Sequence, residues 1–398
     1  MATGVVLIQG VSLFRNYPTN PACGRVLKLF ASLNVIINCD SAVFMKDAQS
    51  PDRLFNGQSV YQDRPGHALL VWAMSSFLKI FGFPNISREI VGNSGDITLY
   101  QSAFYFSYLF INLLVLLVAV YLALNFVNPG IHKPGTYSYA IMSLLVIFLV
   151  AGNELTKTFF WTPHSQMFNI LLPVIALILL NNLKKIKTPQ VFFSLTFGLV
   201  LLMFFYPLFG ILLVILIFSN YSQFWKRTLI VSTVMFGYLL YPKVLEYLGG
   251  SYSNYAILKF RQYVWILDAA KQDKIAERSA TNFNLFISTV PLIPSLLLVI
   301  STILFYVATL KVGNKSIIVK SEFLPHLIFF LVYIFSLLAM GYYSRRLTLG
   351  PFIFLELFML RIGISILKDH FRKLGLIATC SLLLLLGGSW IWTNGPLS

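Results

Sequence analysis

Acidic residues are scarce in this sequence, with only 14 Asp and Glu among 398 residues. Charged residues of both signs make up 11%, whereas a soluble domain covers its surface with roughly 25%. Hydrophobic residues make up 57%, and the mean hydropathy is +0.77. Because the apolar residues form runs of about 15 to 25, the length that crosses a bilayer core, the sequence predicts an all-α polytopic membrane protein.

Cysteine and histidine are also few, with three and five residues respectively. Cys23, Cys39 and Cys380 lack the spacing of a metal site or a paired redox motif. The histidines form no His-x-x-x-His pair, and no Asp-x-Asp signature is present. We therefore expect no cofactor and no obligatory divalent metal.

Positive charge, in contrast, is in excess, and the formal net charge is +16. The Lys and Arg residues lie in loops between the apolar runs, which is typical of positive-inside topology and of contact with anionic headgroups. We therefore expect membrane lipids as partners and no nucleic acid. The sequence does not indicate an oligomeric state.

The apolar runs predict a single transmembrane domain over residues 1–398 with about eleven membrane spans. A further apolar helix at 67–83 and a segment at 4–14 are interpreted as interfacial. Two predicted outer loops are long, residues 40–101 and 247–285, and long loops in bundles usually carry function. The predicted spans are 24–39, 102–125, 138–152, 165–182, 190–206, 207–220, 228–246, 286–310, 325–342, 347–366 and 374–392.

The first acids follow the first predicted span, in the stretch DSAVFMKDA (40–48). Asp40, Phe44 and Asp47 have the spacing of one helix face. A carboxylate at headgroup level is partly desolvated, which suits Asp40 to act as a base. Two simpler interpretations stay open: Asp40 as a helix cap, and Asp47 on a solvated helix face.

This stretch resembles the first outer loop of the GT-C superfamily of membrane glycosyltransferases. The loop there reads D-x3-[YF]-x3-A, then a Gly, a Pro-containing opening and a helix ending in [KL]-x-F-G. Here Asp40, Phe44 and Ala48 are followed by Gly57 and by YQDRPGHALLVWAMSSFLKIFG (61–82). The predicted spans and the two long loops also fit the GT-C layout, which is that of the protein mannosyltransferases.

The resemblance implies an enzyme that uses a polyprenyl-phosphate-linked sugar, with Asp40 as catalytic base or acceptor-orienting carboxylate. The sequence departs from the pattern in two places. No second acid follows Asp40, since Ser41 and Ala42 stand there, and Gly66-His67 replaces the usual aromatic beside the Pro. His67 is a candidate for substrate contact, or else a helix cap.

The stretch GNELTKTFFWTPHSQMF (152–168) supplies the second candidate catalytic carboxylate, Glu154, and the candidate substrate-binding residue His164. Members of the resembled superfamily often present a second acid in this loop. The alternative is an interfacial aromatic belt with solvated polar residues.

The stretch GYYSRRLTLGPF (341–352) presents Tyr343, Arg345 and Arg346 in a predicted outer turn. Guanidinium groups match phosphate bidentately, so this turn is a candidate for holding the donor phosphate, or else ordinary lipid headgroups. Further candidate substrate-binding residues are Asp47 and Arg64 in the first loop, and Lys259 and Arg261 in an amphipathic segment of the second.

The sequence thus predicts an inverting membrane glycosyltransferase, a hexosyl- or pentosyltransferase of cell-envelope glycan biosynthesis. It would move a sugar from polyprenyl phosphate to a lipid, glycan or protein acceptor on the outer face of a bacterial plasma membrane. Asp40 would take the acceptor proton, while Arg345 and Arg346 neutralise the leaving phosphate. Two alternatives stay open: a lipid-linked glycan flippase or transporter, and a catalytically silent GT-C-like scaffold.

Overall fold

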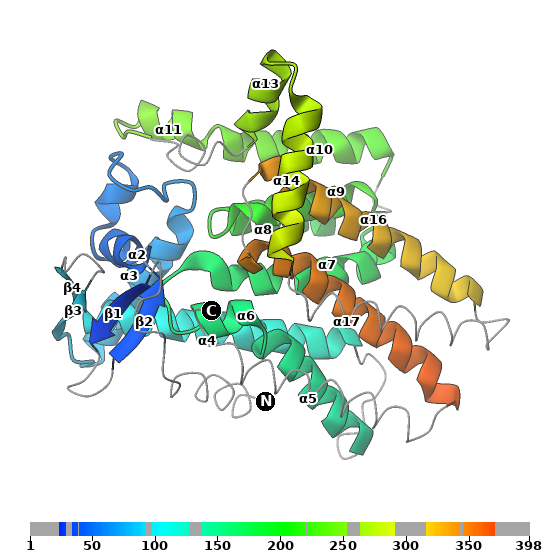
Figure 1. The fold of residues 1–398 in the computed structure, drawn as a ribbon, viewed down its shortest axis with the longest axis horizontal. Helices are drawn as coiled ribbons and strands as arrows, with labels where there is room; N and C mark the ends of the chain where they lie inside the picture. The colour runs from blue at the N-terminus through cyan, green and yellow to red at the C-terminus, as the bar shows by residue number, and fades with distance from the viewer. Residues whose placement is uncertain are drawn as a thin grey trace.

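The computed structural model of the protein is mostly helical (Figure 1). Helices α4 (Ser102–Val127), α7 (Phe168–Asn182) and α17 (Arg345–His370) contact one another at its centre. Helix α16 (Ser316–Met340) packs on α17, and α5 (Tyr137–Ala151) packs on α4. The residues that the structure describes are 24–28, 34–38, 40–91, 97–127, 137–219, 222–252, 263–290, 316–341 and 345–370.

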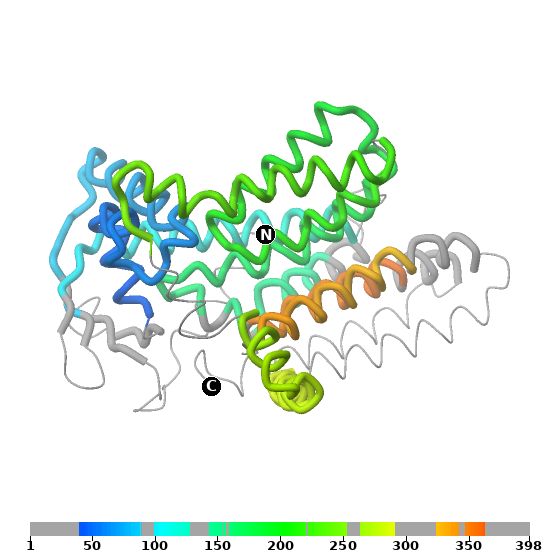
Figure 2. Tube along the Cα trace, turned by 90° about the horizontal axis from the view of Figure 1, so that it is seen from above, coloured from blue at the N-terminus to red at the C-terminus, as the bar shows by residue number. Residues whose placement is uncertain are grey.

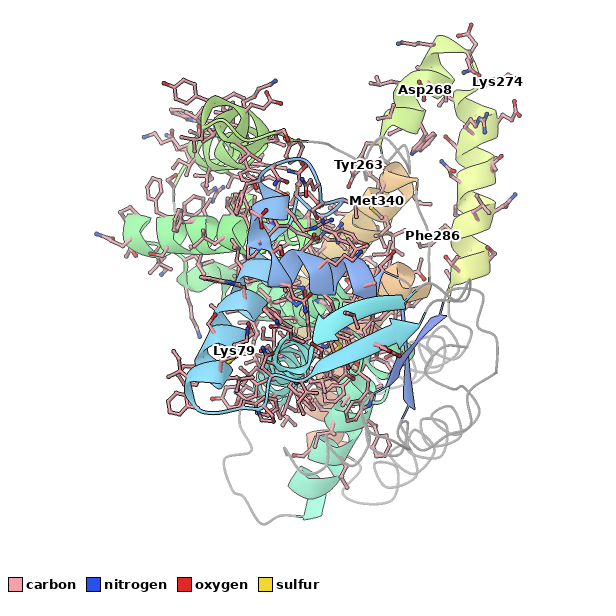
Figure 3. The ribbon with its side chains drawn as sticks, turned by 90° about the vertical axis from the view of Figure 1, so that its left-hand side faces the viewer. Lys79, Tyr263, Asp268, Lys274, Phe286 and Met340 are labelled. Atoms are coloured by element: carbon pink, nitrogen blue, oxygen red, sulfur yellow. The ribbon has the colours of Figure 1, made fainter. Side chains whose placement is uncertain are left out.

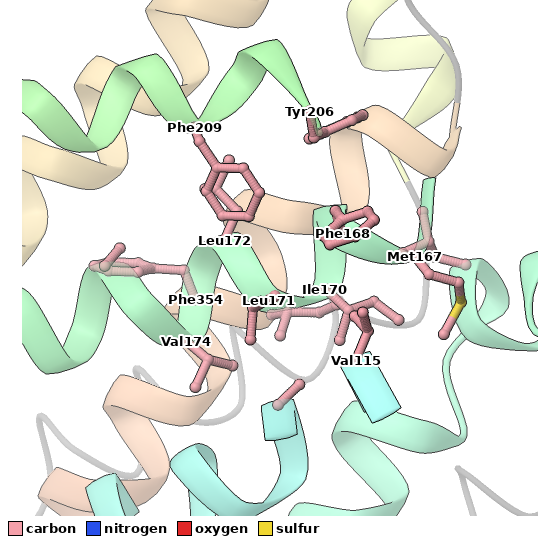
Figure 4. Close-up of a cluster of buried hydrophobic side chains, with 14 of the residues drawn as sticks. Val115, Met167, Phe168, Ile170, Leu171, Leu172, Val174, Tyr206, Phe209 and Phe354 are labelled. Atoms are coloured by element: carbon pink, nitrogen blue, oxygen red, sulfur yellow. The ribbon is translucent and has the colours of Figure 1, made fainter. Parts of the chain in front are cut away.

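The core forms where α7 meets its neighbours. Figure 4 shows the ring of Phe209, from the 3₁₀ turn η4 (Pro207–Leu212), lying against Leu172 of α7. Phe354 of α17 joins the same cluster, and all three side chains are fully buried. Because α7 is apolar on every side, it buries most of its surface against several helices at once.

Two described helices are long and apolar enough to cross a membrane, Ser102–Val127 and Ser165–Lys185. Helix α10 (Phe224–Leu239) and α11 (Tyr241–Tyr247), bent by 41° at their junction, make a third if they act as one span. These three agree with the predicted spans at 102–125, 165–182 and 228–246. An apolar helical protein is therefore confirmed at this coarser level.

The prediction of about eleven spans is wrong for the part of the chain that the structure describes. Helices α5 and α8 (Pro189–Met203) have 15 residues each. At about 1.5 Å per residue, each falls short of a hydrocarbon core of roughly 30 Å. The segment 207–220 divides into η4 and the short α9 (Leu213–Ile217). The segments 4–14 and 374–392, with most of 286–310, lie outside the described residues.

The first predicted span, 24–39, is also wrong, because this segment forms an antiparallel strand pair. Strand β1 (Gly24–Lys28) pairs with β2 (Asn34–Asn38), with Val26 opposite Ile36. With β3 (Ser87–Val91) and β4 (Ile97–Gln101) they make a sheet in the order β2-β1-β3-β4. The apolar run is short for a span and rich in β-branched residues, which favour strands. The described part of the chain is therefore mostly helical with one small sheet.

The first long loop carries α2 (Ser41–Gln49), the 3₁₀ turn η1 (Pro51–Leu54) and α3 (Pro65–Ile80). Helix α3 confirms the helix predicted at 67–83, and it begins with Pro at the first helical position. Seen from above, this loop gathers at one end of the helices (Figure 2). It also meets the second long loop, since the backbone N–H of Ser251 donates to the Phe55 carbonyl at 2.9 Å.

The second long loop forms a helical hairpin of α13 (Val264–Lys271) and α14 (Ile275–Thr289). Figure 3 shows the hairpin extending from the body, with Asp268 and Lys274 near its tip. At its base, the N–H of Tyr263 donates to the Met340 carbonyl at 3.2 Å, and the Trp265 indole donates to the Ala339 carbonyl at 2.9 Å. The hairpin is thereby attached to the end of α16.

Gly350 of α17 is a position where packing forbids a side chain. A Cβ there would overlap the hydroxyl of Tyr333, which is fully buried and donates to Asn169 Oδ1 at 3.2 Å. We expect Gly350→Ala to lower the free energy of unfolding by about 1–3 kcal/mol, because a well-packed interior resists added volume. Thermal unfolding of the purified protein measures this.

The Tyr333→Phe background provides the diagnostic comparison, since it removes the overlapping hydroxyl. The cost of Gly350→Ala should be smaller in that background than in the wild type. Gly198→Ala in α8 is the matched control, because a Cβ there meets nothing within 4 Å. Equal costs of Gly350→Ala in both backgrounds would contradict the packing explanation.

Candidate functional site

Asp40 lies just before α2 and faces a residue from a distant part of the chain. Its carboxylate Oδ2 is 3.8 Å from Nε2 of His164, and its side chain is 41% exposed. Although Asp40 occupies the N-cap position of α2, its side chain makes no capping hydrogen bond. The interpretation of Asp40 as a cap is therefore wrong, and its side chain is partly exposed to solvent.

Helix α4 holds the two halves of this site in place. The Tyr108 hydroxyl donates to the Phe44 carbonyl in α2 at 2.8 Å. One turn further, the Asn112 side-chain amide donates to the carbonyls of Phe159 and Phe160, at 3.1 and 3.0 Å. These polar groups in an otherwise apolar helix fix α2 and the segment before His164 against the same surface.

Aromatic rings pack around His164, the residue that faces Asp40. Phe44, one turn along α2, stacks on Tyr61 with ring centroids 4.1 Å apart and planes at 15°. The His164 ring lies 4.5 Å from Phe44 and 4.9 Å from Phe159. An aromatic wall with a few placed polar groups is the usual composition of a small-molecule site.

Arg64 brings positive charge to the same region. Its guanidinium contacts Asp63 Oδ1 at 3.3 Å and Ser165 Oγ at 3.4 Å, and it lies 5.1 Å from the Tyr61 ring centroid. Since Ser165 follows His164 directly, Arg64 bridges the first loop and the 152–168 stretch. The substrate-binding role predicted for Arg64 stays a prediction.

Asp47 does not lie on a solvated helix face as expected. Its side chain is 1% exposed, its Oδ2 accepts a hydrogen bond from the Ser59 hydroxyl, and its Oδ1 is 3.4 Å from Arg53 Nε. Burial raises the pKa of this carboxyl, more than the hydrogen bonds and charge of Ser59 and Arg53 lower it. Asp47 ties the first loop together, and the substrate role predicted for it gains no support from this placement.

The raised pKa predicts how Asp47 affects stability. The folded state holds this proton more tightly than the unfolded chain, so stability should fall as pH rises above the ordinary Asp value of 3.8. We expect Asp47→Asn to remove this part of the pH dependence of the melting temperature. Asp52→Asn, the same exchange at an exposed neighbour, is the control. If Asp47→Asn lowers the melting temperature at every pH, the contacts of Asp47 with Ser59 and Arg53 stabilise the fold by more than burial of the carboxyl costs.

His67 is not the cap of α3, because Arg64 occupies that position. Its ring is fully buried among Phe44, Tyr108 and Phe168, and neither ring nitrogen has a hydrogen-bond partner. Burial, together with the charges of His164 and Arg64, lowers its pKa from 6.5 to about 3. His67 is therefore a neutral packing residue that does not reach the surface.

The remaining predicted site residues are placed only in part. Glu154 begins α6 (Glu154–Phe159), whose N-cap Asn153 accepts from the Thr156 N–H. Arg345 and Arg346 begin α17, so a helix replaces much of the turn predicted at 341–352. The side chains of these three residues are not described, and Lys259, Arg261 and Tyr343 lie outside the described residues.

The structure also brings in residues that the sequence reasoning missed. Tyr61 packs on Phe44, and Tyr206 donates from its hydroxyl to Gln166 Oε1 at 3.0 Å. Tyr105, Tyr108 and Asn112 share one face of α4, and this polar spacing in an apolar helix was a usable signal. Among the described residues, no three His, Cys, Asp or Glu side chains gather to hold a metal ion.

The structure establishes two features. It has helices long and apolar enough to cross a membrane, and it has a carboxylate–histidine pair packed against aromatic rings. The chain matches no known family model, no characterised protein and no solved structure.

Proposed function

We propose that the protein is a membrane glycosyltransferase of the GT-C type. It takes a sugar from a polyprenyl-phosphate carrier on the outer face of a bacterial plasma membrane and transfers it to a lipid, glycan or protein acceptor. The observation that supports this most is the placement of Asp40. The first acid of the GT-C-like stretch has an accessible carboxylate, beside His164 and an aromatic wall, rather than capping its helix.

In the proposed reaction, Asp40 accepts the proton of an acceptor hydroxyl. The hydroxyl oxygen attacks the anomeric carbon as the bond from that carbon to the phosphate oxygen breaks, so the configuration inverts and polyprenyl phosphate leaves. Arg345 and Arg346, at the beginning of α17, are the proposed phosphate-binding residues, because guanidinium groups stabilise charge on a leaving phosphate. Glu154 remains the second candidate base.

A lipid-linked glycan transporter is the second candidate, and Glu356 favours it. This carboxyl is 9% exposed within α17, and its Oε1 has no hydrogen-bond partner. Ionisable groups inside apolar helices often mark transport pathways. The two candidates differ in chemistry, since a transporter leaves the sugar–phosphate bond intact.

The test is release of free polyprenyl phosphate by the purified protein. A panel of polyprenyl-phosphate hexoses and pentoses is supplied with crude membrane lipid as the acceptor source, and the released carrier is separated and quantified. The proposal expects release with at least one donor, and formation of a glycosylated product. A folded protein that releases carrier from no donor would reject it in favour of the transporter or a silent scaffold.

A further inference from the structure

His164 lies between the accessible carboxylate of Asp40 and the interior of the protein. Its side chain is only 3% exposed, and its ring is packed by Phe44 and Phe159. These contacts hold the ring plane, so the two ring nitrogens have different, fixed surroundings.

Those surroundings decide which nitrogen carries the hydrogen. Nδ1 of His164 accepts the backbone N–H of Gln166 at 3.1 Å and thereby caps the 3₁₀ turn η2 (Ser165–Met167). A nitrogen that accepts a hydrogen bond bears a lone pair, so the neutral ring carries its hydrogen on Nε2. Nε2 is the atom that faces Asp40 Oδ2.

The same contacts oppose a second proton on Nδ1, although the Asp40 carboxylate beside Nε2 favours a charged ring. A second proton on Nδ1 would break the bond to the Gln166 N–H and place positive charge on a buried ring. His67 lies near enough to interact with the ring electrostatically, and Arg64 contacts Ser165, the next residue along the chain. His164 is thus a fixed donor toward Asp40.

We propose that His164 is a positioning residue for Asp40, which orients the carboxylate and stabilises its charged form. This inference rests on the proposed function, in which Asp40 is the base. The 3.8 Å separation is longer than a hydrogen bond, and such contacts tighten when substrate binds. Rotation of the exposed Asp40 side chain toward Nε2 would close the gap.

Two substitutions distinguish a positioning role of His164 from a purely structural one. His164→Asn keeps an acceptor for the Gln166 N–H, because Asn is a good helix cap, but it does not reach Asp40. His164→Gln places an amide N–H where Nε2 lies, but loses the cap. If His164 positions Asp40, His164→Asn should lower kcat about tenfold with KM near the wild-type value. His164→Gln should then recover most of the rate.

The pH profile provides a readout that a structural role would not move. Loss of a donor to the Asp40 carboxylate favours its protonated form, so the acidic limb of kcat in His164→Asn should move to higher pH by about one unit. Tyr61, Arg64 and His67, the other titratable groups around His164, are retained in both variants. An unmoved limb, or a slower Gln variant than Asn variant, would overturn the inference.

A spectroscopic measurement tests the pair without any donor. In protein labelled with ¹⁵N-histidine, the His164 signals, assigned by their absence in His164→Asn, should report a neutral Nε2–H ring between pH 5 and 8. Asp40→Asn should shift the Nε2 signal. A ring that carries its hydrogen on Nδ1 would overturn the inference even if the protein proves active. A neutral Nε2–H ring in a protein that releases no carrier would reject only the proposed function.

Discussion

Asp40→Asn is expected to lower the release of polyprenyl phosphate by at least about a hundredfold, the usual contribution of a general base. Asn has nearly the shape of Asp but does not accept a proton at neutral pH, so acceptor binding should persist while chemistry stops. The Asp40 side chain is 41% exposed and makes no capping hydrogen bond to α2, so the exchange should not disturb folding. The measurement is initial rate at saturating donor, with melting temperature recorded for the same samples.

Asp52→Asn is the matched control for this experiment. Asp52 is an exposed carboxylate in η1, a short distance further along the same loop, and its loss changes the net charge equally. It should keep close to the wild-type rate. Equal rates for Asp40→Asn and the wild type would mean that the protein is a transferase whose catalytic base is another residue. Glu154→Gln would then be the next variant to measure.

His67→Phe is expected to reduce the acid sensitivity of the fold. Between pH 6.5 and about 3, the unfolded chain binds a proton at this histidine that the folded protein excludes. Stability is therefore lost as pH falls through this window. Phe fits the aromatic surroundings, and since neither His67 nitrogen has a partner, the exchange breaks no hydrogen bond. Melting temperatures from pH 4 to 8 in one detergent measure the effect.

The sign of the change in stability with pH identifies which residue causes it. The His67 contribution lowers stability toward acid, whereas the Asp47 contribution lowers it as pH rises above 3.8. His67→Phe and Asp47→Asn should therefore change the profile in opposite directions. His67→Gln provides the packing control, because it keeps a buried polar group and loses the ring. A wild-type slope in His67→Phe would show that His67 is not the acid-sensitive group.

The helices were predictable where the apolar run was long and continuous. The runs at 102–125 and 165–182 correspond closely to Ser102–Val127 and Ser165–Lys185. The helix at 67–83 was also found, since α3 covers Pro65–Ile80. Length and continuity are local properties of a sequence, and they determine helices of this kind without reference to neighbours.

The pairing of strands and the interruption of an apolar helix were not predictable in the same way. The segment 24–39 forms β1 and β2 because β1 also pairs with β3, which lies far along the chain. The segment 207–220 begins as a 3₁₀ turn at Pro207 and continues as a short helix. Apolar composition does not distinguish a strand pair, a broken helix and a membrane span, because each buries the same residues in different partners.

The sequence by itself determined that the chain is an apolar, mostly helical protein, and that Asp40 opens a stretch with the order of the GT-C first loop. Only the tertiary structure decided that Asp40 faces His164, whereas Asp47 and His67 are buried. The physical reason is that α4 binds α2 through Tyr108, and binds the Phe159 carbonyl of α6 through Asn112. Such contacts join segments far apart in the chain, and spacing along a sequence does not record them.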